Sequence, residues 1–275
     1  MRIFDLNFLK STYLRPLSIV LSVGLMSSTS FAILGGDFAQ KTDPNLGAMV
    51  SIISGQISYG FCSGVLIEKD IVLTAAHCIV SHVDGSVKVP DDLKVYHHIK
   101  REPMFGPSRS VVKTYVIPGY IHDKVTLDGS DLALLKIESP FKESKPAALV
   151  QGTDSLKGID SIRIYGYGFQ NLEEVALNKS SPNPKLKVIE KETTPKIKGN
   201  LFLSQLDHTG ICNGDSGGPG FFKVGDRYKV AGIVRSSLQF SSKDEKALPC
   251  TQYAYLTNVY EYLAHIQMGI EELNR

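Results

Sequence analysis

Tryptophan is absent from this 275-residue sequence, cysteine occurs only four times, and neither charge is in marked excess. The 30 basic residues nearly balance the 28 acidic ones, and no block of like charge stands out. We therefore expect no binding to nucleic acid or to an anionic membrane surface. No two cysteines form a Cys-x-x-Cys pair and no cluster of histidine and cysteine has zinc spacing, so we expect no bound metal.

Long hydrophobic runs are also missing. One apolar run, residues 17–26, follows three basic residues but is too short to cross a bilayer comfortably, and no later stretch is apolar enough to do so. Small and polar residues continue as far as Ala32, which completes the pattern of a secretory signal peptide over residues 1–32. A membrane anchor is the weaker alternative. We expect a mature chain that is secreted, to the extracellular space or the periplasm, and that is free of the membrane.

The four cysteines lie beyond the predicted signal, at Cys62, Cys78, Cys212 and Cys250. An even number of cysteines in an exported chain favours two disulfides over metal ligation, because export leads to an oxidising compartment. Their spacing alone does not say which cysteines pair.

Short runs rich in β-branched and aromatic residues recur along the chain, broken by glycine, proline, asparagine and aspartate. This pattern predicts many short strands and an all-β sandwich or set of barrels. The segment 81–107 is polar and is predicted to be loop-rich, and the histidines at 97, 98, 122 and 208 are interpreted as surface residues. The predicted strand runs are residues 48–53, 64–67, 71–74, 111–117, 131–137, 162–165, 185–190, 228–231 and 254–259.

One helix is predicted, at the C-terminal end of the chain. Leu263, Ile266, Ile270 and Leu273 fall at three- and four-residue spacing, which is the stripe of an amphipathic helix over residues 259–273. The prediction is therefore an all-β protein with a terminal helix.

The run from Cys212 to Pro219 (CNGDSGGP) is the most informative stretch of the sequence. Its glycines permit backbone angles closed to other residues, so that amides can converge beside the hydroxyl of Ser216. Backbone N–H groups placed in this way would stabilise an oxyanion. Taken by itself, the run could equally be a glycine-rich turn.

Two residues upstream complete a catalytic set with Ser216. His77 follows an apolar run, and Asp131 is predicted to open a strand. A serine hydroxyl is a poor nucleophile near neutral pH and needs a neutral imidazole to accept its proton. The imidazole needs a carboxylate to hold its tautomer and to stabilise the cation that forms. Asp128 is close enough to Asp131 to compete for that role.

The motifs around these residues resemble those of the trypsin/chymotrypsin-like serine peptidases. With the order His, Asp, Ser along the chain, the similarity rests on residues 33–36 (ILGG), 74–78 (TAAHC), 131–135 (DLALL) and 214–219 (GDSGGP). The resemblance implies two packed six-stranded antiparallel β-barrels, over about residues 33–145 and 146–258, with the triad in the cleft between them. It also implies hydrolysis of protein or peptide substrates through an acyl-enzyme, without a cofactor. We expect a monomer.

Further roles follow from the resemblance. Gly214 and Ser216 would donate their N–H groups to the developing oxyanion. Ile33 would become the mature N-terminus, and its new ammonium would be buried against Asp215, so that freeing this terminus orders the oxyanion loop. Because Ala32 ends the predicted signal peptide, we hypothesise that signal peptidase makes the activating cut directly.

The same resemblance implies how the cysteines pair. Cys62 would pair with Cys78 beside the catalytic histidine, and Cys212 with Cys250 across the substrate pocket. A chain-entropy argument gives the first of these closed loops about 3 kcal/mol of stabilisation.

The substrate pocket implied by the resemblance would be formed by Gly210, Ile211, Ser237 and Ala254. Gly210 stands where trypsin-like members carry an acidic residue at the pocket floor, so an Arg or Lys side chain of the substrate would enter unpaired. Ser237 and Ala254 stand where open-pocketed relatives carry glycine, which narrows the slot. We therefore predict a small or medium apolar side chain before the scissile bond, and not tryptic specificity.

Arg235 departs from the family pattern. It stands where the family usually has a serine that hydrogen-bonds the catalytic aspartate, with an aromatic residue next. The guanidinium has two interpretations. Either it lies near Asp131 and competes with His77 for the carboxylate, or it faces outward and binds an acidic group of the substrate.

Two other functions share some of these features. An α/β-hydrolase esterase also uses Gly-x-Ser-x-Gly, but on a strand-to-helix turn with its histidine downstream. Here residues 219–222 read as strand, and the late His265 belongs to the predicted helix. A non-catalytic binding protein on the same scaffold is the other alternative; the intact serine, histidine and aspartate argue against it, and Arg235 argues for it.

Overall fold

The computed structural model describes most of the chain from Ile33 onward. The predicted signal peptide (1–32), His98, His122 and Asp128 lie outside the described residues. Within the described part, no helix is long and apolar enough to cross a membrane. The described residues are 33–54, 61–81, 85–87, 92–97, 106–121, 130–152, 154, 160–169, 171, 173, 177, 185–197, 199–238 and 250–275.

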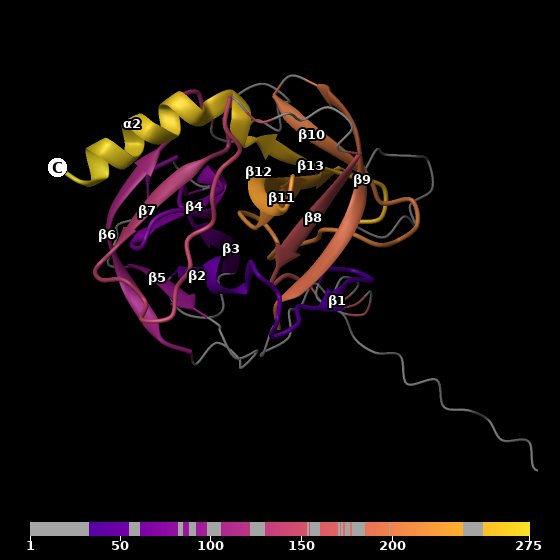
Figure 1. Cartoon of the computed structure of the whole chain (residues 1–275), viewed down its shortest axis with the longest axis horizontal. Coiled ribbons are helices and arrows are strands. Elements are labelled where there is room, and N and C mark those ends of the chain that lie inside the picture. The colour runs from indigo at the N-terminus through magenta and orange to yellow at the C-terminus, as the bar shows by residue number, and fades with distance from the viewer. Residues whose placement is uncertain are drawn as a thin grey trace, which may run out of the picture.

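Six strands of the first half of the chain close into an antiparallel barrel, drawn in indigo to magenta in Figure 1. Around the barrel the order is β2, β3, β4, β7, β6, β5. Strand β4 begins with three apolar residues and is buried along its whole length, so it contributes to the barrel core. The bounds are β2 (Met49–Ser54), β3 (Phe61–Leu66), β4 (Ile71–Thr74), β5 (Leu93–His97), β6 (Ser108–Val116) and β7 (Ala133–Ile137).

The second half of the chain forms a second antiparallel barrel beside the first, with its later strands in orange to yellow in Figure 1. Its order is β9, β10, β13, β12, β11, β8, and pairing of β8 with β9 closes it. A two-residue strand, β1 (Asp37–Phe38), crosses over from the start of the described chain to pair with the beginning of β9. The bounds are β8 (Ser161–Gly166), β9 (Lys187–Ile197), β10 (Asn200–Ser204), β11 (Pro219–Val224), β12 (Arg227–Leu238) and β13 (Tyr253–Asn258).

The C-terminal helix follows the second barrel but packs against the first, on β6 and β7. Gly269 allows the close approach, because a Cβ there would meet Tyr115 and Leu134. The predicted helix is correct in place, but its first turn is a 3-10 helix, Val259–Tyr262, and the α-helix α2 spans Leu263–Leu273. The 3-10 turn begins where the side chain of Asn258 accepts the N–H of Tyr260. The two barrels and this helix confirm the predicted fold.

Strand β5 and its last residue correct the prediction for residues 81–107. This segment contains a strand with an alternating buried pattern, and His97 is fully buried rather than on the surface. Its Nε2 lies 2.9 Å from the carbonyl oxygen of Gly47, and its ring stacks on Phe141. Burial lowers the pKa of His97, so the ring is neutral at pH 7. His208, in contrast, is exposed.

Candidate active site

Strand pairing in the first barrel brings His77 and Asp131 together. Strands β4 and β7 run antiparallel, with Thr74 opposite Ala133. His77 lies in the short 3-10 helix Ala76–Cys78 just after β4, and Asp131 lies just before β7. The end of one strand and the start of the next therefore deliver the imidazole and the carboxylate to the same edge of the barrel. The strand predicted to open at Asp131 begins at Ala133 instead.

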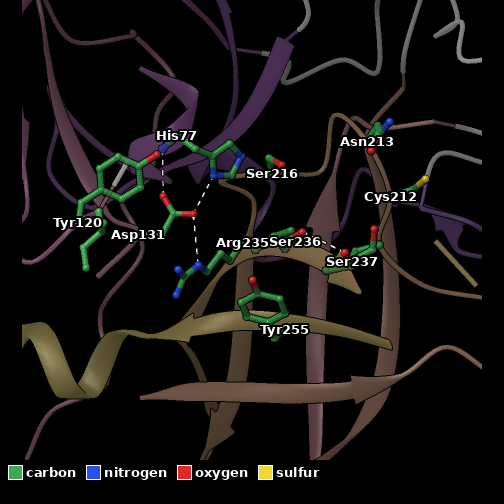
Figure 2. Close-up of a pocket in the computed structure, with 13 residues that line it drawn as sticks. His77, Tyr120, Asp131, Cys212, Asn213, Ser216, Arg235, Ser236, Ser237 and Tyr255 are labelled. Atoms are coloured by element: carbon green, nitrogen blue, oxygen red, sulfur yellow. Dashed lines mark hydrogen bonds and ion pairs between the residues drawn. The ribbon is translucent and has the colours of Figure 1, made fainter. Parts of the chain in front are cut away.

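Asp131 holds His77 through two contacts, both drawn in Figure 2. The backbone N–H of His77 donates to Oδ1 at 2.9 Å, and Nδ1 lies 2.7 Å from Oδ2. Burial acts to raise the pKa of Asp131, but the charge and hydrogen bonds of His77 and the charge of Arg235 outweigh it, so the pKa lies below its ordinary value. The ionised carboxylate accepts a hydrogen bond from Nδ1–H, which leaves Nε2 as the basic atom of the ring.

Ser216 lies in the turn that leads into β11. The N–H of Ser63 donates to the carbonyl oxygen of Ser216 at 2.8 Å, a bond that ties this turn of the second barrel to β3 of the first. The N–H of Gly217 donates to the carbonyl oxygen of Val234 at 2.8 Å and fixes the other side of the turn. Figure 2 shows the Ser216 side chain beside the edge of the His77 ring that faces away from Asp131. The fold thus brings the three predicted residues together.

The backbone before Ser216 is held in one orientation. The carbonyl oxygen of Asn213 accepts the N–H of Phe169 at 2.8 Å. Because C=O and N–H of a trans peptide point in opposite directions, this bond directs the N–H of Gly214 away from Phe169. Gly214 has φ +91°, which favours glycine at this position. The N–H of Gly214, one of the two predicted oxyanion donors, is therefore held in one direction.

The side chain of Ser63 also belongs to this loop, although nothing in the sequence singled it out. Ser63 is almost fully buried, and its Oγ donates to the carbonyl oxygen of Gly214 at 3.0 Å. The same Oγ accepts the N–H of Tyr167 at 3.1 Å. One hydroxyl thus joins both barrels to the residue expected to stabilise the oxyanion.

Replacing Ser63 by alanine is expected to lower kcat about tenfold with little change in KM, because the oxyanion loop loses its brace. It should also destabilise the fold by about 1–3 kcal/mol, since a buried N–H and a buried carbonyl lose their partner. Kinetics and thermal unfolding measure both effects. Ser144→Ala is the matched control, because that hydroxyl donates to the Phe141 carbonyl oxygen away from the site. Equal behaviour of the two variants would remove the role given to Ser63.

Asp215 is a buried carboxylate next to Ser216 in the chain. Its Oδ1 accepts the N–H of Gly168 and its Oδ2 accepts the N–H of Cys212, both at 2.8 Å. Burial raises the pKa of Asp215 to about 7, although those two donors and the charge of Lys187 act in the opposite direction. Gly166 and Gly168 make room for the carboxylate, since a Cβ on either would collide with it. Ionised Asp215 is therefore unfavourable at this buried position unless a nearby cation offsets its charge.

A buried lysine contacts the start of the described chain, and its charge acts on Asp215. Ile33 follows Ala32, so its nitrogen is an amide in this chain, and its side chain is buried in the main core. Lys187 on β9 is fully buried, and its Nζ donates to the carbonyl oxygen of Gly36 at 2.9 Å. Its charge also acts on Asp215. The sequence carries no signal for Lys187, because it is one of several charged residues of β9 and only the fold shows that it is buried.

A cavity of about 320 Å³ is lined by His77, Asp131 and Ser216 and is shown in Figure 2. Two of the four predicted pocket residues, Ile211 and Ser237, line this cavity, whereas Gly210 and Ala254 are not among its lining residues. Ala254 is fully buried in β13. The complete lining is His77, Tyr120, Ile121, Asp131, Ile211, Cys212, Asn213, Ser216, Val234, Arg235, Ser236, Ser237 and Tyr255.

Gly210 is kept from the cavity by a buried glutamine. Gln205 is fully buried; its Nε2 donates to the carbonyl oxygens of Ile211 at 3.1 Å and Cys250 at 2.6 Å, and its Oε1 accepts the N–H of Ile211 at 2.7 Å. A Cβ on Gly210 would lie 2.6 Å from the Gln205 Cδ. Gly210 also has φ +139°, a region that other residues rarely adopt.

An acidic residue at position 210 is therefore expected not to create tryptic specificity. Gly210→Asp should destabilise the fold by about 3 kcal/mol, because it combines a steric clash with unfavourable backbone angles. Thermal unfolding and cleavage of Arg- and Lys-containing peptides test this. Gly152→Asp is the matched control, since a Cβ there has open space around it. A stable Gly210→Asp protein that cleaves after arginine would show that the floor is open.

The cysteines form the two disulfides that the resemblance implies, Cys62–Cys78 and Cys212–Cys250. The first lies beside His77, whose Nε2 is 3.9 Å from the Sγ of Cys78. These three residues are the tightest group of possible metal ligands in the described part of the chain. Because both sulfurs are bonded to each other, they are not thiolates and are poor ligands for a metal.

Arg235 points toward Asp131 rather than toward solvent. Its Nε lies 3.7 Å from Oδ2 of Asp131, its side chain is only 8 % exposed, and its guanidinium lies over the ring of Tyr255. Of the two interpretations, the structure matches the one that places the charge at the catalytic carboxylate. The esterase alternative finds no support, because Ser216 leads into strand β11 and the barrels are antiparallel.

Comparison with known proteins agrees with this geometry. A family model described as Trypsin matches residues 33–266. Granzyme E of Mus musculus is 26% identical over 219 residues, covering 74% of this chain and 83% of the granzyme. Tryptase of Mus musculus is 25% identical over 197 residues (63% and 68% of the two chains). Coagulation factor XII of Cavia porcellus is 27% identical over 181 residues, but the match covers only 29% of that protein. Because the family match spans most of the chain and the two barrels fit it, the protein belongs to the trypsin family.

Proposed function

We propose that the mature protein is a secreted serine endopeptidase with His77, Asp131 and Ser216 as its catalytic triad. The observation that carries the proposal is the contact between Nδ1 of His77 and the buried Oδ2 of Asp131 at 2.7 Å, with Ser216 on the other side of the ring. Membership of the trypsin family supports the same activity. The substrate is a protein or peptide.

In this mechanism Nε2 of His77 takes the proton of the Ser216 hydroxyl as Oγ attacks the peptide carbonyl. The carbonyl oxygen becomes an oxyanion, which the N–H groups of Gly214 and Ser216 stabilise. The imidazolium then gives its proton to the leaving amine, and the acyl group stays on Ser216. Water, activated by Nε2, hydrolyses this ester and restores the serine. Asp131 holds the ring and balances its charge throughout, and the reaction requires no cofactor.

The cavity supports a small or medium apolar side chain before the scissile bond. Ile211 and Val234 give it apolar walls, and Ser237 narrows it. Asp131 is the acidic residue among the described residues that line the cavity, and its carboxylate already pairs with His77 and Arg235. A substrate arginine or lysine would therefore find no available acidic partner there.

Cleavage profiling on a peptide library tests this proposed specificity. We expect cuts after alanine, valine or similar residues, and at least about tenfold weaker cutting after arginine or lysine. A Ser216→Ala protein made in the same way is the control for contaminating peptidases. Strong preference for arginine or lysine would refute the pocket argument while leaving the catalytic assignment in place.

The proposal includes a chain that begins at Ile33 after cleavage of the predicted signal peptide and acts as a monomer. Residues 33–36 match the family motif at this point. N-terminal sequencing of the secreted protein gives the result directly. A start upstream of Ile33 would mean that a second cleavage activates the enzyme.

A further inference from the structure

Arg235 is placed to act on the catalytic carboxylate without touching the substrate's scissile bond. Its Nε lies 3.7 Å from Oδ2 of Asp131, and Nδ1 of His77 lies 2.7 Å from the same oxygen. Nε of Arg235 and Nδ1 of His77 therefore both lie close to the same oxygen of Asp131. Figure 2 shows the three side chains in a row, with Asp131 in the middle.

Asp131 and two tyrosines lie around the guanidinium of Arg235. Tyr255 on β13 lies beneath it, with the guanidinium carbon 5.4 Å from the ring centre, and Tyr262 in the 3-10 turn also lies within its field. Burial raises the pKa of both tyrosines, so both are neutral in the range where the enzyme would work. Among the described residues, the charges that act on Tyr262 are those of Arg235 and Glu261. The close ionic partner of Arg235 is Asp131.

A fixed cation beside the triad changes what happens when the imidazole is protonated. With His77 neutral, Asp131 is a buried anion that needs a counter-charge, and Arg235 supplies one. When His77 gains a proton, the new cation meets Arg235 at short range in a poorly hydrated site, which opposes protonation. The family usually places a neutral serine here, so this effect belongs to the present chain.

We propose that Arg235 is a positioning residue for Asp131, and that its charge extends the activity of the triad to more acidic pH. The inference rests on the proposed peptidase function. It predicts that the acidic limb of the pH profile of kcat/KM depends on the charge at position 235.

The test compares the purified mature protein with Arg235→Gln and Arg235→Lys. Each enzyme is counted by active-site titration, so that misfolded molecules do not contribute. We expect the acidic limb of the kcat/KM profile of Arg235→Gln to move upward by about one pH unit. Arg235→Lys keeps the charge and should keep the limb of the parent protein. Arg235→Met is a second neutral variant in case glutamine prevents folding.

Two results would overturn the inference. One is a neutral variant whose acidic limb coincides with that of the parent protein; the other is a lysine variant that shifts as far as the neutral ones. Proton NMR of the Nδ1-bound proton between His77 and Asp131 follows the same titration without any substrate. If the parent protein hydrolyses no peptide, the proposed function fails, while this titration still shows whether the charge of Arg235 matters.

Discussion

Replacing Asp131 by asparagine is expected to lower kcat about 10⁴-fold with little change in KM, the size that this substitution has in the chymotrypsin-like peptidases. The reason lies in the two contacts to His77. An asparagine amide can donate to Nδ1, which would place the ring proton on Nε2 and leave no basic atom facing Ser216. Steady-state kinetics on a small peptide substrate measures the loss.

Asp131→Asn should also destabilise the fold, in addition to its effect on kcat. Arg235 is buried, and without the carboxylate of Asp131 it keeps its charge but loses the counter-ion, at a cost of about 3 kcal/mol. The double variant Asp131→Asn/Arg235→Gln should recover much of that stability and none of the activity. Ser216→Ala is the control, since it removes the nucleophile without disturbing either charge. An Asp131→Asn enzyme within tenfold of the parent would contradict the triad assignment.

Keeping one residue before Ile33 is expected to lower kcat/KM by roughly a thousandfold. The nitrogen of Ile33 would then be an amide, and Asp215 would lack the ammonium proposed to neutralise it. Burial that raises the pKa of Asp215 to about 7, against about 4 in the unfolded chain, corresponds to about 4 kcal/mol at neutral pH. That energy would favour a loop in which the carboxylate is released and the Gly214 N–H is turned away.

The same carboxylate gives a pH signature. A raised pKa means that the folded protein binds a proton that the unfolded chain has lost, so the contribution of Asp215 is complete below about pH 4 and disappears as the pH rises to about 7. The form that starts at Ala32 should therefore lose stability over this range relative to the form that starts at Ile33. Thermal unfolding of the two forms at several pH values measures the difference.

Asp215→Asn in the form that starts at Ile33 is the matched control for this prediction. It should be as inactive as the form that starts at Ala32. With asparagine at position 215 in both forms, the pH-dependent difference in stability between them should vanish, because the titrating group is gone. Lys187 supplies part of the counter-charge, so Lys187→Met should enlarge the loss in the extended form. Equal activity of the two N-terminal forms would mean that Lys187 alone suffices, and the switch would be wrong.

The sequence was most informative where a local motif is typical of one backbone structure. The strand runs predicted an all-β fold with a terminal helix, and the motifs around His77, Asp131 and Ser216 implied two packed barrels through the family resemblance. The two barrels and the family match confirm this fold. Strand β5 escaped because its alternation is embedded in a polar segment, and its buried end is a histidine, a residue that periodicity does not count as apolar.

The missed features of the site all depend on contacts between distant residues. Ser63 braces Gly214 across 151 positions, and Lys187 bonds Gly36 across the same number, so no local pattern reveals either. Gly210 was placed in the pocket from its position before the nucleophile, but the side chain of Gln205 covers it. The direction of Arg235 is likewise decided by its partners, Asp131 and Tyr255.

The central claim is that Ser216 is a nucleophile activated by His77. Labelling of the mature protein with a fluorophosphonate, followed by mass spectrometry of the peptide that contains Ser216, tests it most directly. We expect one phosphonyl group per molecule, on Ser216, and labelling at least about a hundredfold slower in His77→Ala. Absence of modification at Ser216 in a folded protein that begins at Ile33 would contradict the claim and favour a binding protein on a peptidase scaffold.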